Sequence, residues 1–188
     1  YLNDGSGNFN VGSKDFGPID DFTLSVALGD VDGDGDVDVA VGNDSEQNAV
    51  YLNDGSGNFN VGSKDFGPTD DLTMSVALGD VDGDGALDVA VGNAEGDQNV
   101  AYLNDGSGNF TAGSKDFGSG SDETYSVVLG DVDGDGDLDV AVGNASDQNA
   151  VYLNDGSGNF DAGSKDFGSG SDVTLSVALG DVDGDGDV

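Results

Sequence analysis

A nine-residue acidic loop that recurs along the chain constrains this sequence more than any other feature. The first copy, Asp-Val-Asp-Gly-Asp-Gly-Asp-Val-Asp, spans 30–38, and close copies begin at positions 80, 131 and 181. Carboxylates stand at loop positions 1, 3 and 5 of every copy, with glycines at positions 4 and 6; position 9 is acidic wherever the chain reaches it. So many anions within nine residues repel one another unless a cation lies between them. The loop therefore predicts a cation site.

The residue types of the loop favour calcium among the cations. Ca²⁺ takes about six to eight oxygen ligands at roughly 2.3–2.6 Å, and glycine lets the chain wrap tightly around it. Position 7 is Ala86 in the second copy, so we expect this position to bind through its backbone carbonyl, as in an EF-hand loop. We predict four calcium sites, of which the last is incomplete. Their candidate ligands are Asp30, Asp32, Asp34, Asp36 and Asp38; Asp80, Asp82, Asp84, Ala86 and Asp88; Asp131, Asp133, Asp135, Asp137 and Asp139; and Asp181, Asp183, Asp185 and Asp187.

The sequence after each loop excludes an EF-hand. That motif needs a bidentate glutamate at position 12 and a helix on either side. Position 12 is Val41, Val91 or Val142 in the three complete copies, within an alternating Val-Ala-Val-Gly segment that is typical of a strand. A solvated acidic turn without metal is the remaining alternative, and the recurrence of four copies in one register argues against it.

Composition excludes several classes of partner. The chain has 39 acidic residues against four basic ones and a formal charge of −35, which excludes binding to a nucleic-acid backbone. It has no Cys, so no disulfide or thiolate site is expected. Its apolar runs are far shorter than a membrane span requires, so we expect no membrane insertion.

A longer repeat surrounds the acidic loop and predicts an all-β fold. The sequence Tyr-Leu-Asn-Asp-Gly-Ser-Gly-Asn-Phe begins at positions 1, 51, 102 and 152, so the unit is about 50 residues long. Four strands are expected in the first full unit, at 22–28, 37–41, 49–52 and around 59–61. The recurring Ser-Lys-Asp-Phe-Gly segment is expected to lead to the next unit, with its lysines as edge-strand charges.

A four-stranded sheet of this size cannot bury both faces alone, and radial stacking of such sheets solves the problem. We therefore predict a β-propeller-type array of four-stranded antiparallel blades, with about four repeats in a single repeat domain over 1–188. The predicted units are 1–17 (strands 3 and 4 of a partial blade), 18–67, 68–118, 119–168, and 169–188 (strand 1 and calcium loop of another partial blade). The expected core residues between blades are Val26, Leu28, Val39, Val41 and Val50 with their repeat equivalents, and Phe59 and Phe66 are expected to pack farther out.

The combination of motifs resembles a known family. The acidic loop followed by Val-Ala-Val-Gly-Asn and then Tyr-Leu-Asn-Asp-Gly-Ser-Gly-Asn-Phe is similar to the FG-GAP/VCBS repeat of integrin-α-like β-propellers, over nearly the whole chain. The resemblance implies four-stranded blades in a ring, a structural Ca²⁺ in the loop between the first two strands, and ligand binding at other loops. It implies side-chain ligands at positions 1, 3, 5 and 9 of the loops. About 3.7 repeats do not fill the usual ring of about seven blades.

The mismatch in blade number leaves three arrangements open. The chain could close a four-bladed ring through shared strands, two chains could complete an eight-bladed ring, or the chain could be a segment of a longer array or fibre. Each of the last two involves head-to-tail contacts, which give rings or filaments. We therefore expect self-association.

The motifs favour a non-enzymatic function. The chain has no His or Cys, and no residue that breaks the repeat forms a catalytic constellation. Weak calcium sites of the kind found in extracellular modules would fill only outside the cell. We expect a secreted or cell-surface structural or adhesive protein. A propeller that binds a glycan or protein through the loops opposite the calcium loops is the alternative, and the differences between repeats cluster at 18–23, 44–47, 94–98 and 119–125.

Overall fold

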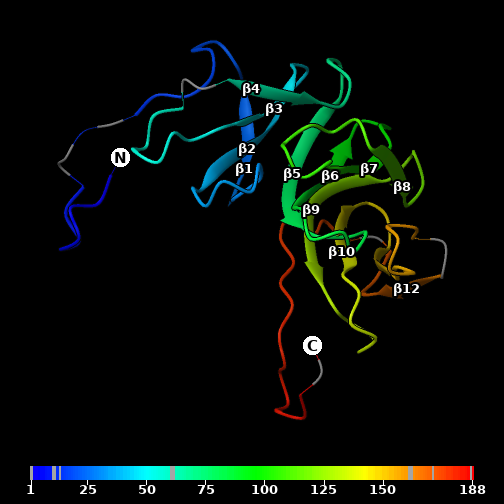
Figure 1. Cartoon of the computed structure of the whole chain (residues 1–188). Helices are drawn as coiled ribbons and strands as arrows, with labels where there is room; N and C mark the ends of the chain where they lie inside the picture. The colour runs from blue at the N-terminus through cyan, green and yellow to red at the C-terminus, as the bar shows by residue number, and fades with distance from the viewer. Residues whose placement is uncertain are drawn as a thin grey trace.

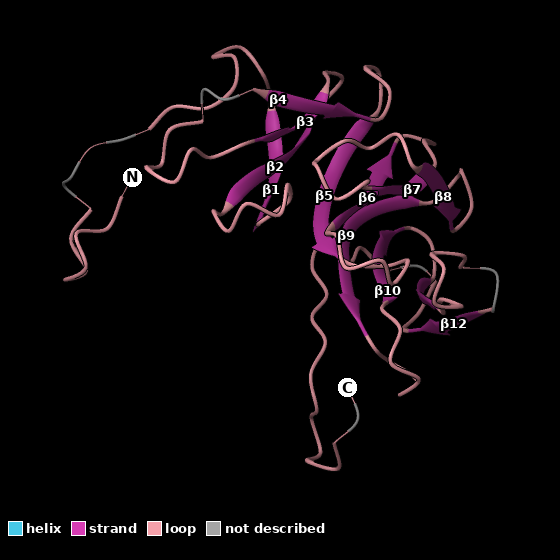
Figure 2. Ribbon diagram, in the orientation of Figure 1, coloured by secondary structure: helices cyan, strands magenta, loops and turns pink. Residues whose placement is uncertain are grey.

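The computed structural model describes residues 2–9, 12, 14–59, 62–160, 163–170, 172–186 and 188. Within these ranges the chain forms twelve β-strands and no helix, which confirms the all-β prediction. The strands make three four-stranded antiparallel sheets, shown in Figure 1 and Figure 2.

Each sheet is a meander in which strands that follow one another in sequence are neighbours. The first sheet contains β1 (Thr23–Gly29), β2 (Asp38–Asn43), β3 (Asn48–Tyr51) and β4 (Ser63–Phe66). The second contains β5 (Leu72–Gly79), β6 (Asp88–Ala94), β7 (Asn99–Leu103) and β8 (Gly113–Phe117). The third contains β9 (Glu123–Gly130), β10 (Asp139–Ala145), β11 (Asn149–Tyr152) and β12 (Ser164–Phe167).

The fourth strand of each sheet is not where the sequence predicted it. The strand expected around 59–61 is wrong where it can be compared: residue 59 lies outside any strand, and residues 60 and 61 lie outside the described part of the chain. The outer strand is instead the Ser-Lys-Asp-Phe segment, which was expected to be a linker and pairs with β3 from Ser63 to Phe66. An edge strand needs only one buried side chain, here Phe66 at 3% exposure, so its hydrophobic signal is weak.

The sheets follow one another in an open arc. β5 packs against β1 and β2 of the preceding sheet, and β9 packs against β5 and β6. Figure 1 shows the N-terminal segment beside the first sheet and the C-terminal segment beside the third. The described part of the chain thus contains three whole sheets, and the arc that they form is open.

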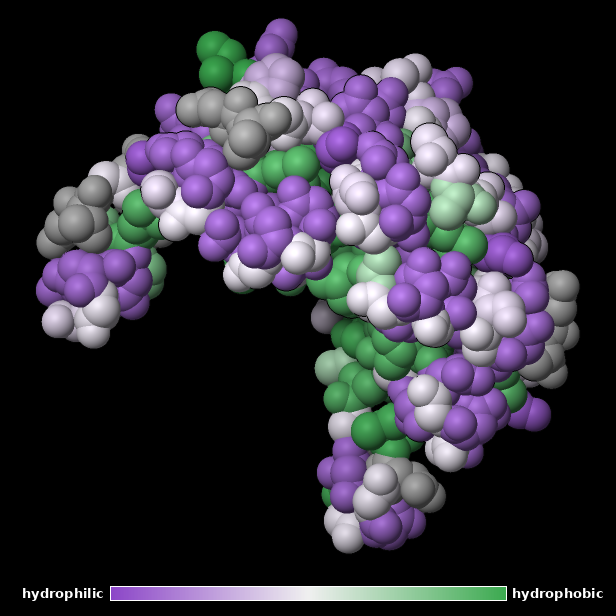
Figure 3. All heavy atoms as spheres, in the orientation of Figure 1, coloured by the Kyte–Doolittle hydropathy of each residue, from purple (hydrophilic) through white to green (hydrophobic). Residues whose placement is uncertain are grey.

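The C-terminal segment continues the stack beyond the third sheet. Val173 forms an isolated bridge with Ala145, and the backbone N–H of Thr174 donates to the carbonyl of Asn144 (3.0 Å). Figure 3 shows apolar residues along this part of the arc, over β5, β9 and the C-terminal segment. The segment therefore stands where the first strand of another sheet would stand.

The core lies mainly between neighbouring sheets. Val39, Val41 and Val50 are buried as predicted, at 5%, 1% and 0% exposure. Val26 and Leu28 were also predicted to be buried, but they are 56% and 67% exposed. Their equivalents in the second and third sheets have a preceding sheet to pack against, whereas β1 is the first strand of the first sheet in the arc.

Glycines on the second strands set the close approach of the sheets. A Cβ atom added to Gly42 would lie 2.6 Å from Cγ2 of Thr73 and 2.9 Å from Cγ1 of Val76 in the next sheet. Gly92 stands in the same relation to Thr124 and Val127. These contacts are too close for any side chain, so glycine is required here by packing between sheets.

A buried polar ladder crosses the same joints. Nδ2 of Asn48 donates to Oγ1 of Thr73 in the next sheet (2.8 Å), and this hydroxyl donates to Oδ1 of Asn93 (2.8 Å). The backbone N–H of Asn93 in turn donates to Oδ1 of Asn99 (2.8 Å). The same links recur through Thr124, Asn144, Asn149 and Thr174. Sequence reasoning missed this ladder, although the recurrence of Thr and Asn at strand ends in every unit was a signal for it.

In the described part of the chain, no helix is long and apolar enough to cross a membrane.

Candidate metal centre

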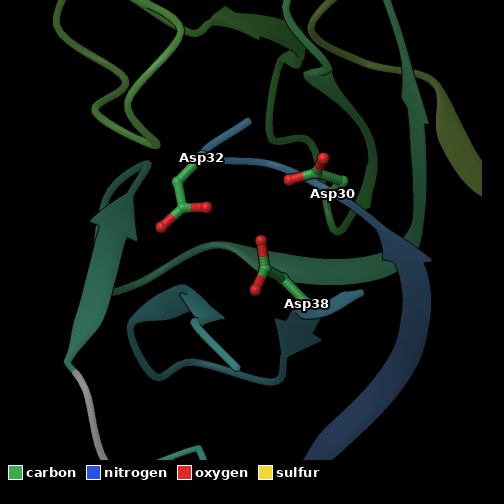
Figure 4. Close-up of side chains that lie close together, drawn as sticks. All are labelled: Asp30, Asp32 and Asp38. Atoms are coloured by element: carbon green, nitrogen blue, oxygen red, sulfur yellow. The ribbon is translucent and has the colours of Figure 1, made fainter. Parts of the chain in front are cut away.

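The acidic loops bring carboxylates together in four places. In each of the first three clusters, the acids at loop positions 1, 3 and 9 each offer one oxygen, and these oxygens lie within 4.8 Å of one another. Figure 4 shows the first cluster, with Asp30, Asp32 and Asp38 pointing toward a common centre. The clusters are Asp30, Asp32 and Asp38; Asp80, Asp82 and Asp88; Asp131, Asp133 and Asp139; and Asp181, Asp183 and Asp185.

The loop is wrapped around the carboxylate at position 1. Oδ2 of Asp30 accepts a hydrogen bond from the backbone N–H of Gly35 (2.9 Å). Gly33 and Gly35 have φ angles of 75° and 96°, in the left-handed region that favours glycine. The glycines at positions 4 and 6 therefore allow five residues to turn back on one side chain, as the sequence predicted.

The carboxylate at position 9 begins the second strand and is fully buried. Oδ2 of Asp38 accepts from the N–H of Val31 (2.8 Å), and Oδ1 accepts from the N–H of Asn53 (2.8 Å). Asp88 and Asp139 make the equivalent pairs of hydrogen bonds. This residue thus closes its own loop and joins it to the loop between the third and fourth strands. Each carboxylate oxygen has a second lone pair, so these bonds leave room for a cation.

The acids at positions 5 and 7 lie differently from the other predicted ligands. Oδ1 of Asp34 accepts from the N–H of Asp36 (2.9 Å), and Asp34 is not part of the first cluster. The side chain of Asp36 lies against Gly55, where an added Cβ would be 2.5 Å from Oδ2. Position 5 is part of a cluster only in the fourth loop, as Asp185.

The remaining predicted ligands follow the same pattern. Asp84 and Asp135 accept from the N–H of their position-7 residues, Ala86 and Asp137. Asp187 lies outside the described part of the chain.

Burial and mutual repulsion raise the pKa of acids in these clusters. The pKa of Asp32 is raised by burial and by the charges of Asp34 and Asp38. Burial raises the pKa of Asp88 to about 6, against the opposing effect of its two backbone hydrogen bonds. The electrostatic arrangement is therefore unfavourable to three ionised carboxylates without an added positive charge.

One oxygen in the first loop is buried without a partner. Oδ1 of Asp30 is shielded from solvent and accepts no hydrogen bond. Three of the four lysines are engaged elsewhere, because Lys14, Lys64 and Lys115 donate to asparagine side chains in the neighbouring unit. A carboxylate that has an unpartnered oxygen and lies in a cluster with two further carboxylates fits the ligand set of a hard divalent cation.

A comparison with curated proteins found no match. The family model described as the FG-GAP-like repeat matches three overlapping stretches, at 30–91, 81–142 and 131–188. Together these matches run without a break from the first acidic loop to the last residue, so the recurring loop-and-strand unit is the feature that the model recognises. This chain belongs to the FG-GAP-like repeat family.

Proposed function

We propose that this protein is a non-enzymatic structural or adhesive repeat protein whose stacked sheets are stabilised by calcium outside the cell. The observation that supports the proposal most directly is the convergence of three carboxylates in each loop, including the unpartnered Oδ1 of Asp30. Calcium supplies the positive charge that these carboxylates otherwise lack. The residues that would hold it in the first three loops are the converging acids at positions 1, 3 and 9. The acid at position 5 and the carbonyl at position 7 are the further ligands expected from the sequence.

Calcium bound in these loops would stabilise the joints between sheets as well as each loop. The side chain of Asn104 donates to the carbonyl of Val31 in the preceding loop (2.7 Å), and Asn154 donates to Val81 in the same way. A loop fixed by an ion therefore holds the acceptor for the next sheet in place. This connection favours a structural role for the metal.

The size of the expected effect is large. Sites with a dissociation constant of roughly 0.1 mM contribute about 1.4 kcal/mol each at about 1 mM calcium. Three or four such sites contribute on the order of 4–6 kcal/mol, comparable with the whole stability of a typical domain. Sites this weak stay empty at cytosolic calcium levels, which favours a secreted or cell-surface location.

The proposal is tested by thermal unfolding and calorimetric titration of the whole chain. We expect the melting temperature to fall steeply when calcium is replaced by excess chelator. Asp133→Asn should remove one site and reduce the calcium effect, whereas Asp116→Asn removes the same charge from the exposed part of β8 and should not. Melts that are identical with and without calcium would exclude the structural role. A dissociation constant for calcium below about 1 μM would remove the argument for a location outside the cell.

A ligand-binding function is the second candidate, and one cleft favours it. A cavity of about 780 Å³ lies between the second and third sheets. Its lining includes Gln98, Asp122 and Asp147 from loops opposite the calcium loops, together with Tyr152. A related cavity of about 690 Å³ lies between the first and second sheets. Amide, carboxylate and aromatic groups of this kind suit a glycan.

A glycan array and light scattering separate the two functions. The structural function predicts no saturable ligand. Saturable binding of one glycan that Tyr152→Ala abolishes would favour the binding function instead. Tyr152→Phe, which keeps the aromatic ring, should maintain the melting temperature.

A further inference from the structure

The basic side chains of this protein all stand at one position of the repeat. They are the four lysines Lys14, Lys64, Lys115 and Lys165, each within a Ser-Lys-Asp-Phe-Gly segment. With 39 acidic residues in the chain, a lysine has many carboxylates with which it could pair. Three of the four instead make one recurring contact with an asparagine of the following unit, so this contact is a property of the joint between units.

The contact brings the lysine amine to the side-chain amide of the asparagine. Nζ donates to Oδ1 over 2.5 Å, 2.8 Å and 2.7 Å in the pairs Lys14 and Asn58, Lys64 and Asn109, and Lys115 and Asn159. The amide carbon Cγ is bonded directly to Oδ1. The amine nitrogen therefore lies beside the electrophilic atom of the asparagine side chain.

An aspartate holds the nitrogen of the same amide. Nδ2 of Asn109 donates to Oδ1 and Oδ2 of Asp105 (3.2 and 3.0 Å). The arrangement recurs in the pairs Asn58 and Asp54, and Asn159 and Asp155. Each joint thus contains an amine, an amide and a carboxylate in one hydrogen-bonded row, which we call the Lys-Asn-Asp triad.

The carboxylate of the triad is ionised and senses the lysine. The hydrogen bond from the side chain of Asn109 lowers the pKa of Asp105 most, and the charge of Lys64 lowers it further. The equivalent residues act on Asp155 in the same way. An ionised carboxylate placed next to an amine and an amide can take a proton from the first and pass it to the second.

The stem of the lysine is packed between units, which limits the positions that its amine can take. An added Cβ on Gly108 would lie 3.4 Å from Cγ of Lys64 and 3.7 Å from Cδ2 of Leu52, whose side chain is 8% exposed. Gly158 stands in the same relation to Lys115. Holding two reacting groups together in this way replaces an encounter between molecules by a step within one molecule, which accelerates reactions strongly.

We propose that the lysine and the asparagine of each triad join covalently, so that isopeptide bonds link successive units of this chain. The neutral amine of Lys64 attacks Cγ of Asn109; a bond forms between Nζ and Cγ, and the bond between Cγ and Nδ2 breaks. Asp105 takes a proton from Nζ and gives it to Nδ2, which leaves as ammonia. One amine and one primary amide become one secondary amide and one ammonia molecule, and no oxidant, reductant or further reactant is needed.

Such bonds suit a stack of sheets in a chain without cysteine. Each bond between Lys64 and Asn109, or between Lys115 and Asn159, would tie the outer strand of one sheet to the loop of the next sheet. A disulfide does the same in other proteins by restricting the unfolded chain, and this chain has no Cys. The bonds would hold the joints together whether or not the acidic loops contain an ion.

The intact mass of the folded chain tests the proposal. We expect it to fall below the mass of the sequence by one ammonia molecule for each bond, to a limit of three, during incubation at about pH 9, where a larger share of lysine amines is neutral than at pH 7. Trypsin should then fail to cleave after Lys14, Lys64 and Lys115, whose amines are acylated. It should still cleave after Lys165, which makes no hydrogen bond to an asparagine in the described part of the chain and is the internal control.

Matched variants separate the roles within one triad. Lys64→Arg keeps the charge and the donors but has no nucleophilic amine, so one bond should be lost and two retained. Asp105→Asn should slow the formation of the same bond by about 10²-fold or more, because the group that moves the proton is gone. Asp65→Asn removes the acid next to Lys64 in β4, whose side chain points to the opposite face of the strand, and should leave the rate unchanged.

Two results would overturn the proposal. An unchanged mass with complete cleavage after all four lysines would mean that the triads are hydrogen-bonded only. Loss of ammonia that is undiminished in Lys64→Arg and in Asn109→Ala would place the reaction elsewhere in the chain. Melting curves show whether the variants are folded. The mass reports the bond with or without calcium, so this test and the test of the proposed calcium function fail independently.

Discussion

The side-chain amide of Asn99 on β7 donates a 2.8 Å hydrogen bond to the hydroxyl of Thr124 on β9, and both residues are fully buried between two sheets. The hydroxyl also donates to Oδ1 of Asn144 (2.7 Å). Thr124 is therefore the point at which one unit of the buried ladder is joined to the next.

Replacing this hydroxyl should weaken the joint. Thr124→Val keeps the shape of the side chain but leaves two buried amide groups unsatisfied, so we expect a loss of about 1–3 kcal/mol in the free energy of unfolding. Thr111→Val, at an exposed position, should change it by less than about 0.5 kcal/mol. Urea unfolding measures both. Equal effects would mean that the ladder contributes nothing to stability.

Filling the glycine gap between sheets should also destabilise the stack. An added Cβ on Gly92 would lie 2.7 Å from Cγ2 of Thr124 and 2.8 Å from Cγ1 of Val127. Gly92→Ala should therefore cost about 1–3 kcal/mol, the usual range for an overpacked core. Gly180→Ala introduces the same methyl group where nothing lies within 4 Å, and dilute protein should show little change in its melting temperature. Equal stability of the two variants would contradict the packing argument.

Two phenylalanines at the same position of the repeat should contribute differently to the free energy of unfolding. Phe117 is 2% exposed and packs against the rings of Tyr152 and Phe160. Phe117→Ala should lower the free energy of unfolding by about 3–5 kcal/mol. Phe167→Ala should cost much less in dilute protein, because its side chain is 41% exposed. Similar losses for both in urea unfolding would show that the joint does not depend on the aromatic contact.

Two half-buried tyrosines should titrate at a higher pH than the tyrosines of the unfolded chain. Burial, with the nearby charges of Asp71 and Asp116, raises the pKa of Tyr102 to about 12, and burial with the charge of Asp122 raises that of Tyr152 to about 12. The folded state therefore holds these protons more tightly than the unfolded state, whose tyrosines titrate near about 10. The contribution of these two tyrosines to the free energy of unfolding is fully present below about pH 10 and is lost as the pH rises through about 12.

Ultraviolet absorbance of the phenolate measures this titration directly. Asp122→Asn should lower the pKa of Tyr152 and leave that of Tyr102 unchanged. If Tyr102 and Tyr152 ionised at the same pH in native protein as in urea-unfolded protein, the partial burial of these rings would be contradicted.

Position 7 of the acidic loop should not need a carboxylate for the proposed calcium binding. Ala86 occupies it in the second loop, and the side chain of Asp137 lies against Gly156, where an added Cβ would be 2.5 Å from Oδ2. We expect Asp137→Ala to keep the number of bound calcium ions, whereas Asp133→Ala should lower it by one. Isothermal titration calorimetry counts the ions. Loss of a site in Asp137→Ala would assign a ligand role to that side chain.

Local sequence was sufficient to predict the strands next to the loops and the meeting of acids at positions 1, 3 and 9. The spacing of Asp30, Asp32 and Asp38 and the intervening glycines determine that wrap within nine residues, so little tertiary information is needed. The outer strand was missed because Ser63–Phe66 has only one buried side chain and is a strand only through its pairing with β3. Alternation alone does not identify such a segment as a strand.

The repeat, the all-β class and the acidic loops could be predicted from residue order alone, because they depend on contacts within about fifty residues. Which of the equivalent residues are buried depends on how the sheets stack: Val76 is 7% exposed and Val26 is 56% exposed, although the surrounding sequences are nearly the same. It also decided that Asn48 meets Thr73 and that Lys64 meets Asn109. These differences have one physical reason, which is that a unit buries its face only where another unit is stacked against it.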